Sequence, residues 1–290
     1  MLRGLRTLTS QYDAFLVDLY GVIHNGGPPF DGAVDALREL AAAGRRVVFL
    51  SNTSRLGAAV AESLAGIGID PELYEAVISS GDVTRDAILS RDGGLFDLLP
   101  EHPRCIHLGD PSFVPWLFDL GLTFDDANED TVPTADLVIA SGAPGDDAAL
   151  AHVQQQLVPA AARGIPLVCT NPDRVIPTST GLTLGPGAVA AAYADLGGRV
   201  FLYGKPHAPI YAAARKLLGD DWQSERIVAM GDLLDTDIRG ARAIGIASVL
   251  VTGTGGHAAA LGPAPTPTAL DALFASTGIA PDMILSRFAW

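Results

Sequence analysis

The stretch AFLVDLYGV, residues 14–22, decides the fold of this chain. Four apolar residues lead directly into the carboxylate of Asp18, which is typical of a buried parallel strand that ends at the functional edge of a sheet. An amphipathic pattern over 32–43 predicts a helix that ends at Gly44, and the apolar run over 46–50 predicts a second strand that closes at Ser51. This order predicts a βαβ unit with parallel strands.

The same alternation continues along the chain and predicts an α/β fold, with a Rossmann-like parallel sheet and a second α/β unit inserted into it. Further strands are expected over 76–78, 104–108, 136–140, 166–169, 200–203, 226–230 and 247–251, and further helices over 58–66, 81–89, 112–120, 146–162, 187–196, 207–218 and 235–244. The Gly- and Pro-rich stretch 253–267 is expected to be a loop. We expect a core domain of residues 1–81 and 183–290 and an inserted domain of residues 82–182.

Composition excludes several classes of protein. With 290 residues and 48% hydrophobic content, the chain can bury a core without disulfides. Cys105 and Cys169 lie in apolar stretches without metal-ligand spacing, so we expect free, buried thiols in a reducing compartment. The net charge of -14 argues against a nucleic-acid partner. No signal-peptide pattern or membrane-spanning run is present, so a cytoplasmic protein without a membrane partner is expected.

Four short segments, 18–22, 50–52, 204–206 and 231–237, each follow or end an apolar run. In an open α/β sheet these positions meet at the carboxyl edge, where such folds bind ligands. Asp18 is a candidate nucleophile, because a carboxylate can attack phosphorus and form an aspartyl-phosphate. Lys205 can offer a positive charge to a phosphate group. Ser51 and Asn52 precede a helix, where hydroxyl and amide donors bind phosphate oxygens, although a plain helix cap has the same pattern.

The fourth segment, GDLLDTD, places three carboxylates within six residues. Asp232, Asp235 and Asp237 would repel one another unless a cation neutralises them, and oxygen-only ligands indicate Mg²⁺. One carboxylate from Asp18 and one from Asp232 would suffice to hold it. A structural interpretation also fits. In it, Asp235 is the N-cap of a helix, and the negative charge of Asp237 interacts favourably with the positive end of the helix dipole.

Together these segments resemble the four motifs of the haloacid dehalogenase (HAD) superfamily over essentially the whole chain. More narrowly, the chain is similar to the class IIA branch, which includes nitrophenyl, pyridoxal and phosphoglycolate phosphatases. The stretches 79–82, 170–173 and 185–187 also fit that branch. The resemblance implies a HAD core with an inserted α/β cap domain of the C2 type, placed between the second and third motifs. The inserted unit predicted above falls in that interval.

The same resemblance implies roles around the metal. Asp18 would be the nucleophile, and Mg²⁺ would be held by Asp18, the backbone carbonyl of Tyr20 and Asp232. Asp237 would orient the lysine or a water molecule, and Asp235 is expected beside it, behind the ligands.

Substrate contacts are implied as well. Lys205 would steady the developing charge, and Ser51 and Asn52 would bind phosphate. Three residues of the cap are expected to face the substrate: Asn171, Asp173 and Arg174. The partner implied is a small phosphorylated metabolite, and a homodimer formed through the cap is expected by resemblance.

One position departs from the family pattern. Phosphatases of the family usually carry a second Asp two residues after the nucleophile, which serves as general acid and base, and here that residue is Tyr20. Loss of such a group typically costs about 10²–10⁴-fold in rate. The sequence therefore predicts a Mg²⁺-dependent phosphomonoester hydrolase that works through an aspartyl-phosphate and is slow or restricted to good leaving groups. One alternative is a non-catalytic phosphometabolite-binding protein. The other is a metal-independent dehalogenase, because true dehalogenases have Tyr at this position. The acidic cluster argues against the dehalogenase.

Overall fold

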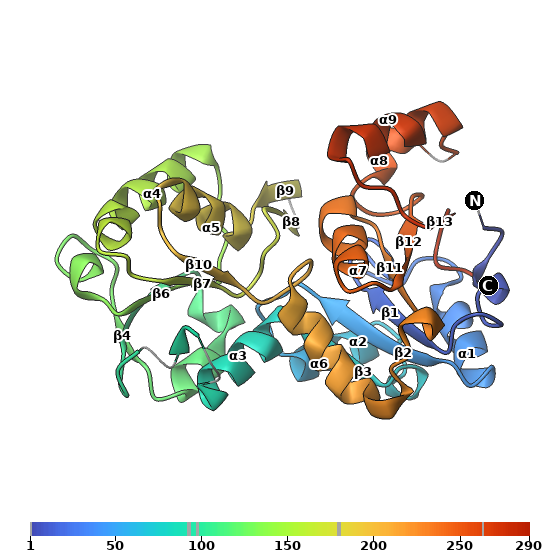
Figure 1. Ribbon diagram of the computed structural model, residues 1–290, viewed down its shortest axis with the longest axis horizontal. Helices are drawn as coiled ribbons and strands as arrows, with labels where there is room; N and C mark the ends of the chain where they lie inside the picture. The colour runs from blue at the N-terminus through green and yellow to red at the C-terminus, as the bar shows by residue number, and fades with distance from the viewer. Residues whose placement is uncertain (1, 92–93, 97–98, 179–180, 263) are drawn as a thin grey trace. The chain divides into compact units, whose positions relative to one another are not determined.

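The computed structural model describes residues 2–91, 94–96, 99–178, 181–262 and 264–290. The chain divides into two compact units. The core unit comprises Met1–Ser51, Gly57–Ile78 and Lys205–Trp290, and the cap unit comprises Asn52–Leu56 and Ser79–Gly204 (Figure 1). Among the described residues, no helix is both long and apolar enough to cross a membrane.

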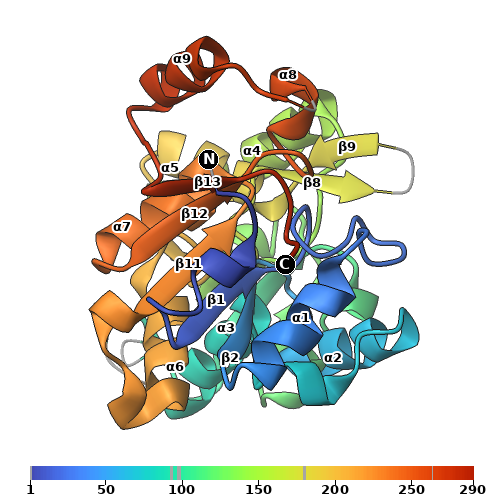
Figure 2. The same ribbon diagram turned by 90° about the vertical axis from the view of Figure 1, so that its right-hand side faces the viewer.

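The core unit is built on a six-stranded sheet with the strand order β13-β12-β11-β1-β2-β3. Its strands are β1 (Ala14–Asp18), β2 (Arg46–Ser51), β3 (Ala76–Ser79), β11 (Ile227–Gly231), β12 (Ala247–Val251) and β13 (Met283–Leu285). Its helices are α1 (Ala33–Ala42), α2 (Gly57–Gly66), α6 (Ala208–Leu218), α7 (Arg239–Ala243), α8 (Ala258–Leu261) and α9 (Pro267–Thr277). Figure 2 shows α1 and α2 on one face of the sheet and α6 and α7 on the other. The expected parallel α/β core is confirmed.

The central strands are apolar because both of their faces are covered. Every residue of β11 is buried, and so are the first four residues of β1. Val17 pairs in parallel with Phe49 on one side and with Met230 on the other. Asp18, the next residue, therefore lies at the carboxyl edge of the sheet, where β2 and β11 also end.

The cap unit contains a five-stranded sheet with the order β10-β7-β6-β4-β5, and its strands are parallel. These strands are β4 (Arg104–Leu108), β5 (Thr123–Asp125), β6 (Leu137–Ala140), β7 (Leu167–Cys169) and β10 (Val200–Leu202). The helices are α3 (Ser80–Ser90), α4 (Asp147–Ala162) and α5 (Pro186–Asp195), and an antiparallel hairpin is formed by β8 (Val175–Thr178) and β9 (Gly181–Leu184).

Strand pairing in the cap differs from the sequence-based expectation. The segment from 183 onward was expected in the core, but β10 pairs with β7, with Val200 opposite Leu167, and α5 belongs to the same unit. An apolar run indicates that a strand is buried but carries no information on which sheet receives it. We propose that the cap domain extends from about Ser79 to Gly204.

Other local differences have simple causes. The helix expected over 112–120 is two short 3₁₀ helices, η4 (Pro111–Phe113) and η5 (Pro115–Asp119), because Pro115 has no N–H to continue a helical ladder. The elements β5, β8, β9, α9 and β13 were not expected, and α8 lies inside the predicted loop 253–267. The described residues also include the 3₁₀ helices η1 (Leu5–Thr7), η2 (Pro71–Leu73), η6 (Val132–Thr134), η7 (Gly219–Asp221) and η8 (Ser224–Arg226).

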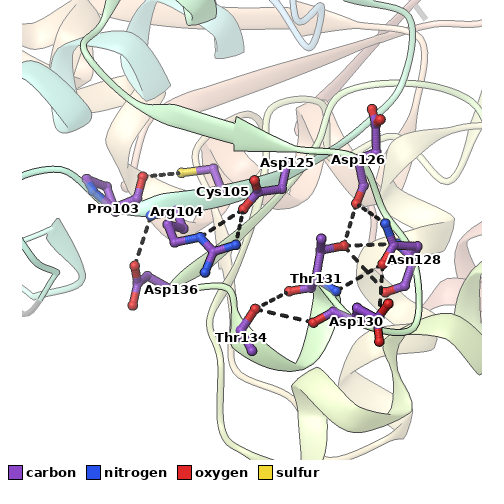
Figure 3. A network of polar contacts seen from close by, with 10 residues as sticks. All are labelled: Pro103, Arg104, Cys105, Asp125, Asp126, Asn128, Asp130, Thr131, Thr134 and Asp136. Carbon is purple, nitrogen blue, oxygen red and sulfur yellow. Dashed lines mark hydrogen bonds and ion pairs between the residues drawn. The ribbon is translucent and has the colours of Figure 1, made fainter.

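A polar network at the edge of the cap sheet connects three of its strands (Figure 3). The Arg104 guanidinium donates through Nε to Asp125 at 2.9 Å, and the Arg104 backbone N–H donates to Asp136 at 2.9 Å. After β5, Asn128 Oδ1 accepts the backbone N–H of Thr131 at 3.0 Å, which shapes the following turn. Because Arg104 is half exposed, the ion pair contributes under about 1 kcal/mol.

Candidate active site

Four ionisable side chains meet at the carboxyl edge of the core sheet. Asp18 ends β1, Asp232 follows β11, and Lys205 is the first core residue after the cap unit. The Lys205 Nζ lies 2.6 Å from Asp18 Oδ1 and 2.8 Å from Asp237 Oδ1. One carboxylate oxygen from each of Asp18, Asp232 and Asp237 lies within 4.8 Å of the other two. The structure thus brings the first, third and fourth sequence segments together in one cluster.

The electrostatics of this cluster favour a bound cation. Lys205, Asp232 and Asp237 are each at most 4% exposed, and the Asp18 side chain is 12% exposed, so three carboxylates with little access to water surround one ammonium group. Burial, followed by repulsion from Asp237, raises the pKa of Asp232 to about 7. Burial raises the pKa of Asp18 well above its usual range, and the carboxylates facing Lys205 raise its pKa. A buried, net negative set of carboxylate oxygens fits Mg²⁺, which takes oxygen ligands and would neutralise the excess charge.

The fourth segment folds as a five-residue π-helix, η9 (Leu234–Ile238), and not as the α-helix expected there. Within it, Asp237 turns back into the cluster, where its Oδ2 accepts the backbone N–H of Leu233 at 3.2 Å. Asp235 points elsewhere: it is exposed and pairs with Arg239 at 2.6 Å. Asp235 is therefore not the helix cap that the structural interpretation expected, because it lies within the π-helix and no described side chain caps its start. Its expected place behind the metal ligands stays a prediction. Single π turns are frequent at functional sites because they re-aim side chains.

The loop after β12 completes the cluster, and sequence reasoning missed it. The stretch 253–267 was expected only to be a loop, but the backbone N–H of Gly256 donates to Asp232 Oδ2 at 2.5 Å. The next residue, His257, accepts the backbone N–H of Leu234 through Nε2 at 3.4 Å. The position of this glycine-rich segment could have placed it at the site, because it follows a strand that ends at the same sheet edge as Asp18.

The predicted substrate residues of the cap unit lie around one loop after β7. Asn52 Nδ2 donates to Asp173 Oδ1 at 2.8 Å, and Asn171 Oδ1 accepts the Asp173 backbone N–H at 2.9 Å. Arg174 is exposed, and its carbonyl accepts the N–H of Gly185 before α5. The structure thus joins Asn52 to Asp173.

Ser51 ends β2 in the core unit, one residue beyond Leu50, which pairs with Asp18. This register places it at the same sheet edge as the nucleophile candidate. The contacts of Ser51, Asn52 and the cap residues with a substrate stay predictions.

Two family models match this chain, and the first of them also covers the early part of the cap unit. A haloacid dehalogenase-like hydrolase model matches residues 15–123, and a HAD-hydrolase-like model matches residues 202–281. The chain belongs to the haloacid dehalogenase-like hydrolases. The membership expected from the four segments is thereby confirmed.

Several relatives of this HAD-like hydrolase carry phosphatase names. The acid sugar phosphatase of Staphylococcus aureus strain USA300 is 28% identical over 244 residues, covering 83% of this chain and 86% of that protein. A crystal structure of a haloacid dehalogenase-like family hydrolase from Brucella suis 1330 is 28% identical, with a TM-score of 0.77 and full coverage of both chains. The p-nitrophenyl phosphatase from Archaeoglobus fulgidus shares the fold, with a TM-score of 0.69, 22% identity and coverage of 96% and 97%.

The turn after the nucleophile shows what Tyr20 can do in this HAD-like hydrolase. Tyr20 is 37% exposed, and burial together with the charge of Asp232 raises the pKa of its phenol. Tyr20 therefore stays protonated at neutral pH and can donate a hydrogen bond but cannot accept a proton. Nearby, His24 Nδ1 accepts the backbone N–H of Gly26 at 2.8 Å, which gives this histidine a role in shaping the turn.

Proposed function

We propose that this chain is a Mg²⁺-dependent phosphomonoester hydrolase that acts on a small phosphorylated metabolite through an aspartyl-phosphate on Asp18. The observation that carries the proposal is the Lys205 ammonium group, which is hydrogen-bonded to both Asp18 and Asp237 beside a third buried carboxylate. A dehalogenase has no need for this acidic set. The names of the relatives support phosphate esters as the substrate class.

In the first step, a carboxylate oxygen of Asp18 attacks phosphorus in line with the ester oxygen. The new oxygen–phosphorus bond forms as the bond to the leaving group breaks. Lys205 touches the nucleophile and balances negative charge that develops on the phosphoryl oxygens. Asp18, the Tyr20 carbonyl and Asp232 would hold Mg²⁺, which supplies Lewis-acid stabilisation of the same charge when it is bound.

In the second step, water attacks the phosphorus of the aspartyl-phosphate, releases inorganic phosphate and restores the Asp18 carboxylate. The water passes its proton to a phosphoryl oxygen and leaves with it as inorganic phosphate, because the protonated Tyr20 phenol cannot take this proton. Tyr20 can still donate a hydrogen bond to the ester oxygen or to phosphate. We therefore expect a slow second step and a preference for esters with good leaving groups.

We assign recognition of the rest of the substrate to the cap residues Asn171, Asp173 and Arg174. Ser51 and Asn52 are assigned to binding the phosphate group. Sugar phosphates are the first candidates, because an acid sugar phosphatase is among the relatives. The buried free thiols of Cys105 and Cys169 support a reducing, cytoplasmic location.

The decisive experiment measures phosphate release from p-nitrophenyl phosphate and a panel of sugar phosphates with and without Mg²⁺. We expect Mg²⁺-dependent release by the wild type and none by Asp18→Asn. Chloride release from a haloacid without metal would instead show a dehalogenase.

A second candidate, a phosphometabolite-binding protein without turnover, is favoured by Tyr20 alone. It would be shown by a wild type that is inactive on every ester tested while Tyr20→Asp gains activity.

A further inference from the structure

The loop formed by residues 253–257, here called the glycine loop, packs directly on the Asp232 carboxylate. The backbone N–H of Gly256 donates to Asp232 Oδ2, and Asp232 is 4% exposed. This hydrogen bond restrains the orientation of the carboxylate plane. One oxygen of the same carboxylate also lies within 4.8 Å of carboxylate oxygens of Asp18 and Asp237.

Two glycines enclose the same carboxylate from different parts of the chain. Gly21 follows the nucleophile turn with φ +83°, and Gly255 lies in the glycine loop with φ +76°. A Cβ atom added to either residue would overlap the carboxylate of Asp232, and a Cβ on Gly21 would also meet the Cα of Gly255. Positive φ is a conformation that side chains disfavour, so both geometry and space require glycine here.

His257 connects the glycine loop to the π-helix that carries Asp237. Its Nε2 accepts the backbone N–H of Leu234, the first residue of η9. Burial lowers the pKa of His257, so the imidazole is neutral and one ring nitrogen is free to accept. The glycine loop therefore contacts both Asp232 and the start of the segment behind it.

We infer that the glycine loop, through Gly255, Gly256 and His257, is a positioning element that sets the Asp232 carboxylate for a divalent cation. The inference rests on the proposed function for the identity of the cation as Mg²⁺. Partners that orient a metal ligand without touching the metal typically contribute about 10–100-fold to metal affinity. None of the three residues is assigned a contact with the substrate.

The test compares Gly255→Ala with Gly245→Ala by isothermal titration of the full-length protein with Mg²⁺ alone. Gly245 has φ +73° and nothing within 4 Å of an added Cβ, so its variant carries the same backbone strain without the carboxylate overlap. We expect Gly255→Ala to weaken Mg²⁺ binding by about 10–100-fold. Gly245→Ala should bind Mg²⁺ as the wild type does, although both variants lower the unfolding midpoint of the metal-free protein.

A second pair keeps the test decisive if Gly255→Ala does not fold. His257→Ala removes the acceptor for Leu234, whereas His257→Gln can replace it with a side-chain carbonyl, and His152→Ala serves as a control on an exposed face of α4. We expect weaker Mg²⁺ binding in His257→Ala, recovery in His257→Gln and no change in His152→Ala.

Equal Mg²⁺ affinity in the wild type, Gly255→Ala and His257→Ala would overturn the inference and leave the proposed function intact. A wild type that binds no Mg²⁺ would instead reject the metal site, and with it the proposed function. The two failures are therefore distinguished by the wild-type titration.

Discussion

Lys205 is the single cation among the four clustered ionisable side chains, and its partners show how a lone lysine acquires a function. Its ammonium group reaches the carboxylates of Asp18 and Asp237 within 2.8 Å while its side chain is 5% exposed. In sequence, a lysine between a glycine and a proline after a strand is a weak signal. The buried carboxylates on both sides make it part of the proposed catalytic centre.

Replacing Lys205 by Met should therefore affect activity more than substrate affinity. Methionine keeps the volume of the buried stem but removes the charge that balances the transition state, and loss of one such group typically lowers kcat by about 10²–10³-fold. Steady-state kinetics with p-nitrophenyl phosphate checks this, and Lys216→Met, on the last turn of α6, is the control. A kcat close to that of the wild type would remove Lys205 from the mechanism.

At the scale of elements, α3 begins where the chain enters the cap unit, and its start is well defined. Ser79 Oγ accepts the backbone N–H of Asp82 at 2.9 Å, while Asp82 accepts the backbone N–H of Ser79 at 2.9 Å. This reciprocal pair is a capping box, and Ser79 is fully buried. The segment 79–82 resembled the family at the sequence level, and the structure supplies a physical reason for it.

Ser79→Ala should lower the free energy of unfolding by about 1–2 kcal/mol, the upper part of the usual range for an N-cap, because the site is buried. The matched control is Ser90→Ala in the last turn of the same helix, which is exposed and should be neutral or slightly stabilising. Urea unfolding of both variants measures the difference. Equal effects at the two ends would contradict the capping role.

Several of the elements that sequence analysis missed share a cause. β5 and β13 have three residues each, too short for a periodic pattern, and the π-helix at 234–238 depends on tertiary contacts with Lys205 and the glycine loop. The assignment of β10 to the core failed because its partner β7 is known only from pairing. Short strands and sheet membership are decided by distant residues.

At the scale of the whole molecule, the acidic cluster couples stability to pH and to metal. Burial raises the pKa of Asp232 to about 7, whereas an unfolded Asp has a pKa of about 3.9. The metal-free folded state therefore holds more protons than the unfolded state between these values. The resulting stabilisation is complete below the unfolded pKa and is lost as pH rises towards 7.

Mg²⁺ must displace these protons, so its stabilising effect should grow with pH. We expect the Mg²⁺-induced rise in unfolding midpoint to be small at pH 5.5, roughly a pH unit or more below the folded pKa, and full near pH 8, about a unit above it. Thermal unfolding with and without Mg²⁺ across this range measures it. Asp232→Asn should abolish the Mg²⁺ effect, and Asp235→Asn, on the exposed side of the π-helix, should retain it. A Mg²⁺ effect independent of pH would contradict the raised pKa.

The homodimer expected through the cap stays a prediction.

The sequence by itself determined the parallel α/β class, the inserted unit and the strand ends that carry Asp18, Ser51 and Asp232, because buried strands, helix periodicity and carboxylates at strand ends are local patterns. Tertiary structure alone decided that β10 joins the cap sheet, that Asp237 enters the cluster while Asp235 leaves it, and that a glycine-rich loop holds Asp232. Those outcomes depend on contacts between residues far apart in the chain, and local patterns do not encode such contacts.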